Sequence, residues 1–102
     1  MNLGRVVGSI VATRKDERLR GHKLLLVQKL KPGEGAQLVP SRGSSEFLVS
    51  VDLVGAGTGE LILYTSGSSA RNAASESYDN PIDAAIVGIV DTTDIDERVL
   101  IL

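Results

Sequence analysis

Apolar and polar residues alternate at every second position in five segments of the chain, and this alternation is typical of β-strands. The expected strands cover residues 3–13, 22–30, 46–54, 60–66 and 84–91. In the third strand the apolar side chains share one face, which carries Phe47, Val49, Val51 and Leu53. The other face carries Glu46, Ser50 and Asp52. The stretch VLIL at 99–102 predicts a last short strand.

Small and charged residues separate these strands. The segment RKDERLRG at 14–21 predicts an exposed turn, and KPGEGAQLVPSRGSS at 31–45 predicts the longest irregular piece. One short helix is expected within GSSARNAAS at 67–75, with Ser68 or Ser69 as its N-cap. Short connections favour antiparallel pairing. The sequence therefore predicts an all-β fold, a small five-stranded OB-like barrel with one short helix, although a sandwich shares this spacing.

The bulk composition limits the classes of function. A length of 102 residues predicts one soluble domain, 1–102, with a modest core. A net charge of −2 and 3% aromatic residues argue against a nucleic-acid site, which needs clustered basic residues or stacking side chains. The absence of a long apolar run argues against a membrane span, and the absence of cysteine excludes thiolate metal sites. The core is poor in aromatic residues, which hints that apolar surface is buried against other subunits.

The stretch VGAGTGE at 54–60 raises the question of a phosphate-binding loop, because Gly55, Gly57 and Gly59 directly follow an expected strand. Such loops require a helix after the last glycine, or a lysine followed by Ser or Thr. Here the following residues predict a strand, and Glu60 would repel a phosphate. We therefore expect no nucleotide cofactor. The glycines indicate a tight turn with positive φ angles or a close approach of another backbone.

Asp52 and Asp83 are carboxylates within or beside apolar strands. Such an aspartate is usually hydrogen-bonded to backbone N–H groups or paired with an arginine, for which Arg71 is a candidate. A catalytic carboxylate pair lacks a second base and metal ligands. His22 is the only histidine, so we expect neither a metal site nor a histidine-based triad.

The motif GSSAR at 67–71 differs from the Gly-x-Ser-x-Gly elbow of serine hydrolases, because Arg71 stands where the last glycine is needed. We interpret its hydroxyl groups as helix caps and its arginine as available for a subunit contact. No catalytic residue is therefore expected in this segment.

Four motifs follow one another along the chain: GRVVGSIVATRKDERLRGHKLLLVQ at 4–28, VDLVGAGTGE at 51–60, GSSAR at 67–71 and PIDAAIVGIVD at 81–91. Together they resemble the vertex proteins of bacterial microcompartments, the family that includes carboxysome and ethanolamine-utilisation vertex proteins. The resemblance spans nearly the entire chain. The parts least like the family are the loop 33–45 and the tail after Asp91.

This resemblance implies a non-enzymatic barrel that assembles into a cyclic homopentamer in a microcompartment shell in the bacterial cytoplasm. In the family, such pentamers cap the five-fold corners of a shell that hexameric proteins otherwise tile, so hexameric shell proteins are the implied partners. A closed ring uses a heterologous contact. The residues expected at the subunit seam are Asp52, Gly55, Gly57, Gly59, Glu60, Arg71 and Asp83. Those expected around the central opening are Gly67, Ser68 and Ser69.

Two alternatives remain open at this point. An OB-type barrel can be a ligand-binding module without catalysis, and a salt-dependent gel shift would test nucleic acid as its ligand. A small enzyme that uses the glycines as a phosphate loop would be stabilised by a nucleotide in a thermal-shift assay.

Overall fold

The computed structural model describes residues 1–13, 15–42, 46–74 and 81–102. Its strands are β1 (Asn2–Ile10), β2 (Lys23–Pro32), β3 (Leu38–Pro40), β4 (Phe47–Asp52), β5 (Leu61–Ser66) and β6 (Ala84–Ile89). Its helical elements are α1 (Ser68–Ala74) and the short 3-10 turns η1 (Glu17–Leu19) and η2 (Glu34–Ala36). The five expected strands and the expected helix are all present, with bounds shifted by a few residues.

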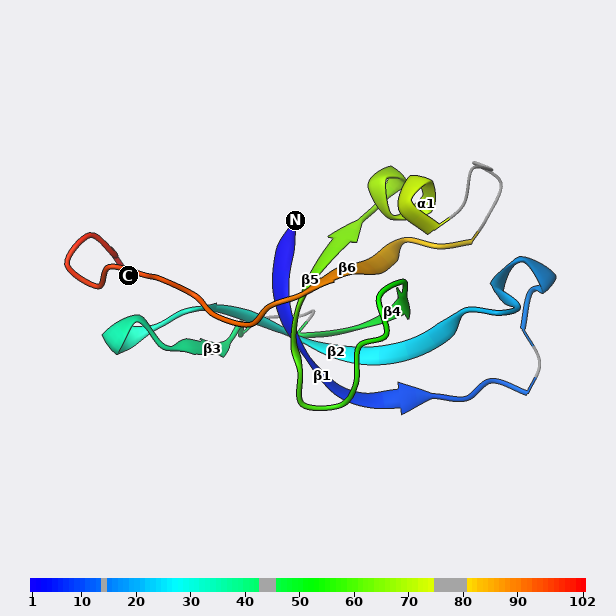
Figure 1. Ribbon diagram of the computed structural model, residues 1–102, viewed down its shortest axis with the longest axis horizontal. Coiled ribbons are helices and arrows are strands. Elements are labelled where there is room, and N and C mark those ends of the chain that lie inside the picture. The colour runs from blue at the N-terminus through cyan, green and yellow to red at the C-terminus, as the bar shows by residue number, and fades with distance from the viewer. Residues whose placement is uncertain (14, 43–45, 75–80) are drawn as a thin grey trace.

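Five of the strands close into a barrel. They follow the order β1-β5-β6-β4-β2, and β2 pairs back with β1. β3 adds a short strand to the far end of β2, outside the closed ring. In Figure 1 this β2–β3 hairpin and the C-terminal tail leave the barrel on one side, while α1 lies on the other. The predicted five-stranded barrel with one short helix is confirmed.

One strand pair differs from the antiparallel pattern that the short connections predict. β4 and β6 run parallel and share only two residue pairs, Val51↔Ala85 and Asp52↔Ile86. These strands are not consecutive, because β5 and α1 lie between them and act as the crossover that a parallel pair needs. The prediction of purely antiparallel pairing is therefore wrong for the pair that closes the barrel.

The barrel interior holds the main apolar core. Its buried members come from four strands and from the loop after β4: Val6, Leu25, Val27, Ala56, Ile62, Tyr64 and Ile86. A second cluster lies outside the barrel and joins residues of β4, α1 and β6 with the segment before β6; its buried members are Val51, Ala70, Ile82 and Ala85. Ala70 is 0% exposed and Ala74 packs against the same cluster, so these two alanines hold the short helix to the barrel.

The face of β4 that points into the barrel is not the more apolar one that its sequence pattern suggests. Ser50 is 1% exposed, and Leu48, on the same face, packs against the barrel core. Side chains alternate along a strand, so Phe47 and Val49 point outward, and they are 48% and 46% exposed. Only Val51 on that outer face is buried, by the second cluster. The more apolar face of β4 is therefore the outer one, and its first half lies open.

The segment 99–102 forms no strand in the isolated chain, so this prediction is wrong for the single subunit. The N–H groups of Val99 and Leu100 both donate to the carbonyl oxygen of Asp96, at 3.1 and 3.2 Å, which makes a turn. Arg98 holds the Asp96 carboxylate at 2.9 Å. Within the described part of the segment predicted to be irregular, 31–42, the chain forms η2 and β3, which the pattern did not predict.

Candidate functional site

The glycine loop, residues 53–60, joins β4 to β5 and begins at an aspartate that organises its backbone. Oδ1 of Asp52 accepts hydrogen bonds from the N–H groups of Val54, at 3.1 Å, and Gly55, at 3.2 Å. Aspartate favours such turns because its short side chain reaches the backbone two residues further on. The predicted hydrogen bonding of Asp52 to backbone N–H groups is confirmed.

Glu60 closes the other end of the glycine loop. Its Oε1 accepts the N–H of Gly57 at 2.7 Å, and its own N–H donates to the carbonyl oxygen of Gly57 at 3.1 Å. A charged acceptor makes this hydrogen bond stronger than a neutral one would. The carboxylate therefore takes a backbone donor that a phosphate would need.

Two of the three glycines have the backbone conformation that the turn interpretation expects. Gly55 and Gly59 have φ angles of 81° and 93°, in the left-handed region that residues with a Cβ rarely adopt. Gly57 has no positive φ. A Cβ on Gly57 would lie 3.4 Å from Oε1 of Glu60, so its small size makes room for the carboxylate.

Strand β1 and the barrel core fix the loop in place. The N–H of Gly59 donates to the carbonyl oxygen of Val6 at 2.7 Å, and the N–H of Val6 donates to the backbone carbonyl oxygen of Glu60 at 3.0 Å. The Arg5 guanidinium donates to the carbonyl oxygen of Gly59 at 2.9 Å. Ala56 is 1% exposed and belongs to the core. The N–H groups of Gly55, Gly57 and Gly59 thus all have acceptors within the chain, so the glycines offer no free donors to a phosphate.

The outer side of the glycine loop is open in the single subunit. A Cβ on Gly55 or Gly59 would meet no atom within 4 Å. Leu53 and Val54 are 36% and 40% exposed. The loop therefore presents a firm, partly apolar surface on which another backbone can lie closely. The place of this loop in a subunit seam stays a prediction.

The segment GSSAR forms the start of α1. The helix begins at Ser68, so Gly67 takes the N-cap position, and its carbonyl oxygen accepts the N–H groups of Ala70 at 3.1 Å and Arg71 at 3.3 Å. The predicted N-cap role of Ser68 or Ser69 is therefore wrong. Both serines are exposed on the first turn, and their place around a central opening stays a prediction.

Asp83 lies directly before β6 and is exposed. Its carbonyl oxygen accepts the N–H of Gly67 at 2.9 Å, which ties the start of α1 to the start of β6. Arg71 is partly buried on α1. A pairing of Arg71 with Asp52 or Asp83 stays a prediction.

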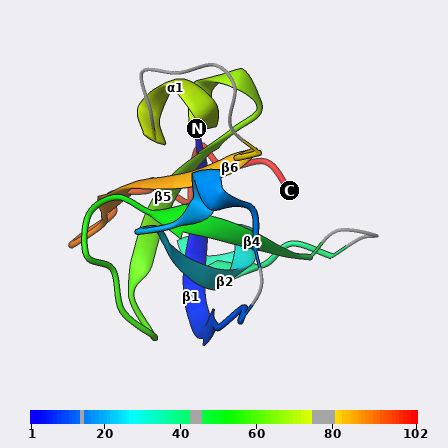
Figure 2. The ribbon, with the colours of Figure 1, turned by 90° about the vertical axis from the view of Figure 1, so that its right-hand side faces the viewer.

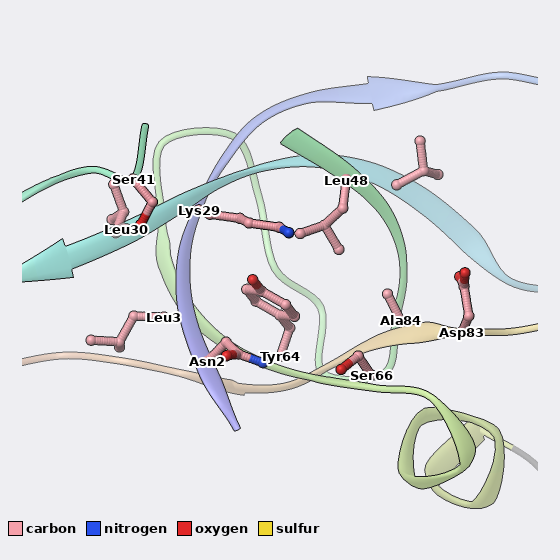
Figure 3. A pocket seen from close by; sticks show the side chains of 11 residues that line it. Asn2, Leu3, Lys29, Leu30, Ser41, Leu48, Tyr64, Ser66, Asp83 and Ala84 are labelled. Atoms are coloured by element: carbon pink, nitrogen blue, oxygen red, sulfur yellow. The ribbon is translucent and has the colours of Figure 1, made fainter. Parts of the chain in front are cut away.

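A cleft that no sequence motif predicts lies between the first half of β4 and the start of β6. Its larger hollow has a volume of about 630 Å³. Figure 3 shows Tyr64 across its floor, Lys29 pointing into it and Asp83 at its rim. Burial raises the pKa of the Tyr64 phenol above its usual 10.0. A smaller hollow of about 160 Å³ continues outside the barrel over Val51 and Ile82. We call the two hollows together the β4 cleft.

The chemistry of this surface is limited in the parts of the chain that the structure describes. There, no group of three or more His, Cys, Asp or Glu side chains is placed to hold a metal ion. None of the described helices is long and apolar enough to cross a bilayer. The β4 cleft brings together residues from strands far apart in the sequence, so the exposed apolar residues of β4 are its only sequence signal.

The charged turn between β1 and β2 pairs its charges internally. Arg18 lies 2.8 Å from Asp16, and Arg20 lies 2.8 Å from Glu17. The hydrogen bonds from Arg18 hold the pKa of the Asp16 carboxyl well below its usual 3.8. For its described residues, 15–21, the predicted exposed turn is confirmed, and η1 lies within it.

Known proteins share both the sequence and the fold of this chain. A family model described as "Ethanolamine utilisation protein EutN/carboxysome" matches residues 1–91. The chain is 47% identical over 94 residues to the bacterial microcompartment shell vertex protein GrpN of Rhodospirillum rubrum (strain F11), with 92% of this chain and 97% of that protein covered. The solved structure of the GrpN pentameric microcompartment shell protein from Rhodospirillum rubrum matches with a TM-score of 0.74 and 44% identity, covering 94% of this chain and 100% of that chain. The solved structure of Gloeobacter violaceus CcmL matches with a TM-score of 0.76 and 39% identity, covering 95% and 92% of the two chains.

Proposed function

The chain belongs to the family of ethanolamine utilisation protein EutN and the carboxysome proteins, and on this premise we propose that it forms a cyclic homopentamer that closes a five-fold vertex of a bacterial microcompartment shell. The observation that carries the proposal is 47% identity, over nearly the whole chain, to a shell vertex protein. The role is structural rather than catalytic. The ring sits among hexameric shell proteins in the bacterial cytoplasm.

A ring of identical subunits needs two different surfaces on each chain that fit one another. Figures 1 and 2 both show the glycine loop on one side of the barrel and α1 on the opposite side, so the chain offers two such surfaces. We assign the seam to the residues of these two surfaces: Asp52, Gly55, Gly57, Gly59, Glu60, Arg71 and Asp83. The surface at the start of α1, which consists of Gly67, Ser68 and Ser69, faces the central opening in this assignment.

Exposed apolar surface on the single subunit supports its assembly into a ring. In the described part of the chain, seven large apolar residues of strands and loops are 36% to 48% exposed: Val7, Ile10, Phe47, Val49, Leu53, Val54 and Ile89. Covering apolar surface with a neighbouring subunit contributes about 25 cal/mol for each Å² removed from water. A vertex pentamer gives this surface a partner, and a flat array of hexagonal tiles gains the curvature that it needs to close.

The alternative of a ligand-binding module is supported less well by the same geometry. The N–H groups of Gly55, Gly57 and Gly59, which a phosphate loop would use, have acceptors within the chain. Tyr64 lies in the larger hollow but is only 5% exposed, so its ring is not available to stack on a base.

Native mass spectrometry of the full chain tests the ring. We expect a five-subunit mass at micromolar concentration, and a persistent monomer would refute the pentamer. Coexpression with hexameric shell proteins then tests the vertex role by electron microscopy. Closed polyhedral shells are expected with this chain and open sheets or tubes without it. Open assemblies in both cases would refute the vertex role even if the pentamer forms.

A further inference from the structure

Among the residues that the structure describes, no strand pairs with the outer backbone edge of the first half of β4. β4 pairs with β2 along its whole length, but with β6 only at its last two residues. The N–H of Lys29 on β2 donates to the carbonyl oxygen of Glu46 at 2.8 Å. This hydrogen bond shows that the backbone groups of Glu46 point toward β2. Backbone groups of alternate residues point to the same neighbour, so those of Phe47 and Val49 point away from β2. They face the β4 cleft, where β6 does not reach them.

The side chains along this edge are apolar and exposed. Phe47 and Val49 are 48% and 46% exposed, and the smaller hollow beside them is lined largely by apolar residues such as Leu24 and Ile82. An exposed, apolar strand edge is a ready template for another strand, and native proteins normally cover one. The edge of β4 therefore requires a partner in the assembled protein.

The C-terminal tail, residues 91–102, carries apolar side chains that the single subunit does not bury. Val99, Ile101 and Leu102 are 73%, 94% and 71% exposed. The tail lies beside η2, where a Cβ on Gly35 would be 4.0 Å from Oε2 of Glu97. Figure 1 places it at the end of the molecule opposite α1, along a longest dimension of 48 Å. The tail therefore extends from the barrel on the side of the β2–β3 hairpin.

Charge favours contact between the tail and the body of another copy. The tail has four acidic residues, Asp91, Asp94, Asp96 and Glu97, against one arginine, Arg98. Because the whole chain has a net charge of −2, residues 1–90 carry a net charge of +1. Two tails therefore repel one another, whereas residues 1–90 of a second copy carry no net negative charge that would repel a tail.

We propose that residues 99–102 of one subunit add as a strand to the open edge of β4 in the neighbouring subunit, with Val99 and Ile101 on the outer face beside Phe47 and Val49. This inference rests on the proposed pentamer and names one of its contacts. In this contact VLIL forms the strand that the sequence predicts, because its main-chain hydrogen bonds go to β4 of the neighbouring subunit. The tail that makes this contact lies outside residues 1–91, the part that the family model matches, whereas the β4 edge that receives it lies within them.

Disulfide cross-linking tests the contact directly, because the chain has no cysteine of its own. The variants Val49→Cys and Ile101→Cys are prepared separately, mixed under mild oxidation and compared with each variant alone. We expect linked dimers in the mixture only, and a ladder of up to five linked chains from the double variant. The control pairs Ile101→Cys with Val7→Cys, whose position on β1 is 38% exposed but away from the β4 edge.

Native mass spectra of the reduced variants separate the two possible failures. A pentamer whose cross-linking does not exceed that of the control overturns the tail contact, and it leaves the β4 cleft to another shell component. A monomer overturns the proposed function itself.

A second variant tests the energetics without cysteine. The double change Val99→Ser and Ile101→Ser should raise the concentration at which half of the pentamer dissociates by about tenfold or more, since two apolar side chains lose their cover. The matched control changes Thr92 and Thr93 to Ser, at exposed positions in the same tail. Equal dissociation of the two double variants would overturn the proposal.

Discussion

Gly55 and Gly21 form a matched pair of positions that separates backbone strain from contact with a neighbour. Their φ angles are 81° and 82°, and a Cβ on either would meet no atom within 4 Å in the single subunit. Gly55 lies in the glycine loop of the proposed seam, whereas Gly21 lies in the charged turn before β2. A difference between the same substitution at the two positions therefore reports the surroundings of Gly55 in the ring.

The expected magnitudes follow from the backbone and from the space in the ring. Alanine in the left-handed region costs about 1–2 kcal/mol, part of which the lower entropy of the unfolded chain offsets. The free energy of unfolding should therefore fall by about 1 kcal/mol for Gly55→Ala and for Gly21→Ala alike. Asparagine adopts this conformation more readily, so Gly55→Asn and Gly21→Asn add a side chain with less strain. Between two closely packed backbones, that side chain costs about 1–3 kcal/mol per contact.

Urea unfolding measures the first quantity, and sedimentation velocity over a dilution series measures dissociation of the pentamer. We expect Gly55→Asn to dissociate at a concentration about tenfold higher than Gly21→Asn, which should match the unchanged chain. Pentamers of equal stability from both asparagine variants would show that Gly55 lies outside the seam.

Two further predictions concern side chains with defined partners. Glu60→Ala should lower the free energy of unfolding by about 1–2 kcal/mol in urea titrations, because the N–H of Gly57 loses a charged acceptor, while Glu60→Gln should recover much of this loss; equal losses in both variants would contradict it. The Asp16 carboxyl should titrate below its usual 3.8 in NMR spectra, and its midpoint should rise toward 3.8 in Arg18→Ala. Because the pKa of Asp16 is lowered in the folded chain, the stabilisation of this turn by Arg18 is present at pH values above the usual pKa of an aspartate. It is lost as the pH falls through the folded pKa of Asp16. An unchanged midpoint in Arg18→Ala would rule out the pairing of Asp16 with Arg18.

Alternation of side chains predicted the strands of the barrel but not how they pair or which face is buried. The inner face of β4 is covered by the barrel core around Leu48 and Ser50, whereas its more apolar outer face is covered only at Val51, by the second cluster. A period of two marks two faces, yet it does not say which of them lies inside a closed barrel. β3 was missed because its three residues, Leu38–Pro40, are too few for alternation to register.

The candidate site was predictable where the chemistry is local. An aspartate at a strand end followed by glycines predicts the hydrogen bonds of Asp52, and Glu60 lies within the same short turn. The β4 cleft was not predictable, because it exists only where the two-residue ladder between β4 and β6 ends. The N-cap of α1 is Gly67, and its N–H donates to the backbone carbonyl oxygen of Asp83, which is distant in the sequence. This contact between distant residues is why the sequence did not identify the N-cap.

The internal hydrogen bonds of the glycine loop have a kinetic consequence for assembly. The loop that Asp52 and Glu60 organise is complete in the isolated subunit, so docking there orders little further backbone. Subunits should then meet as preformed surfaces, at association rates of about 10⁵–10⁷ M⁻¹s⁻¹, without waiting for a folding step. A vertex built from such pieces can enter a shell late, when the surrounding tiles have already left a gap of fixed shape.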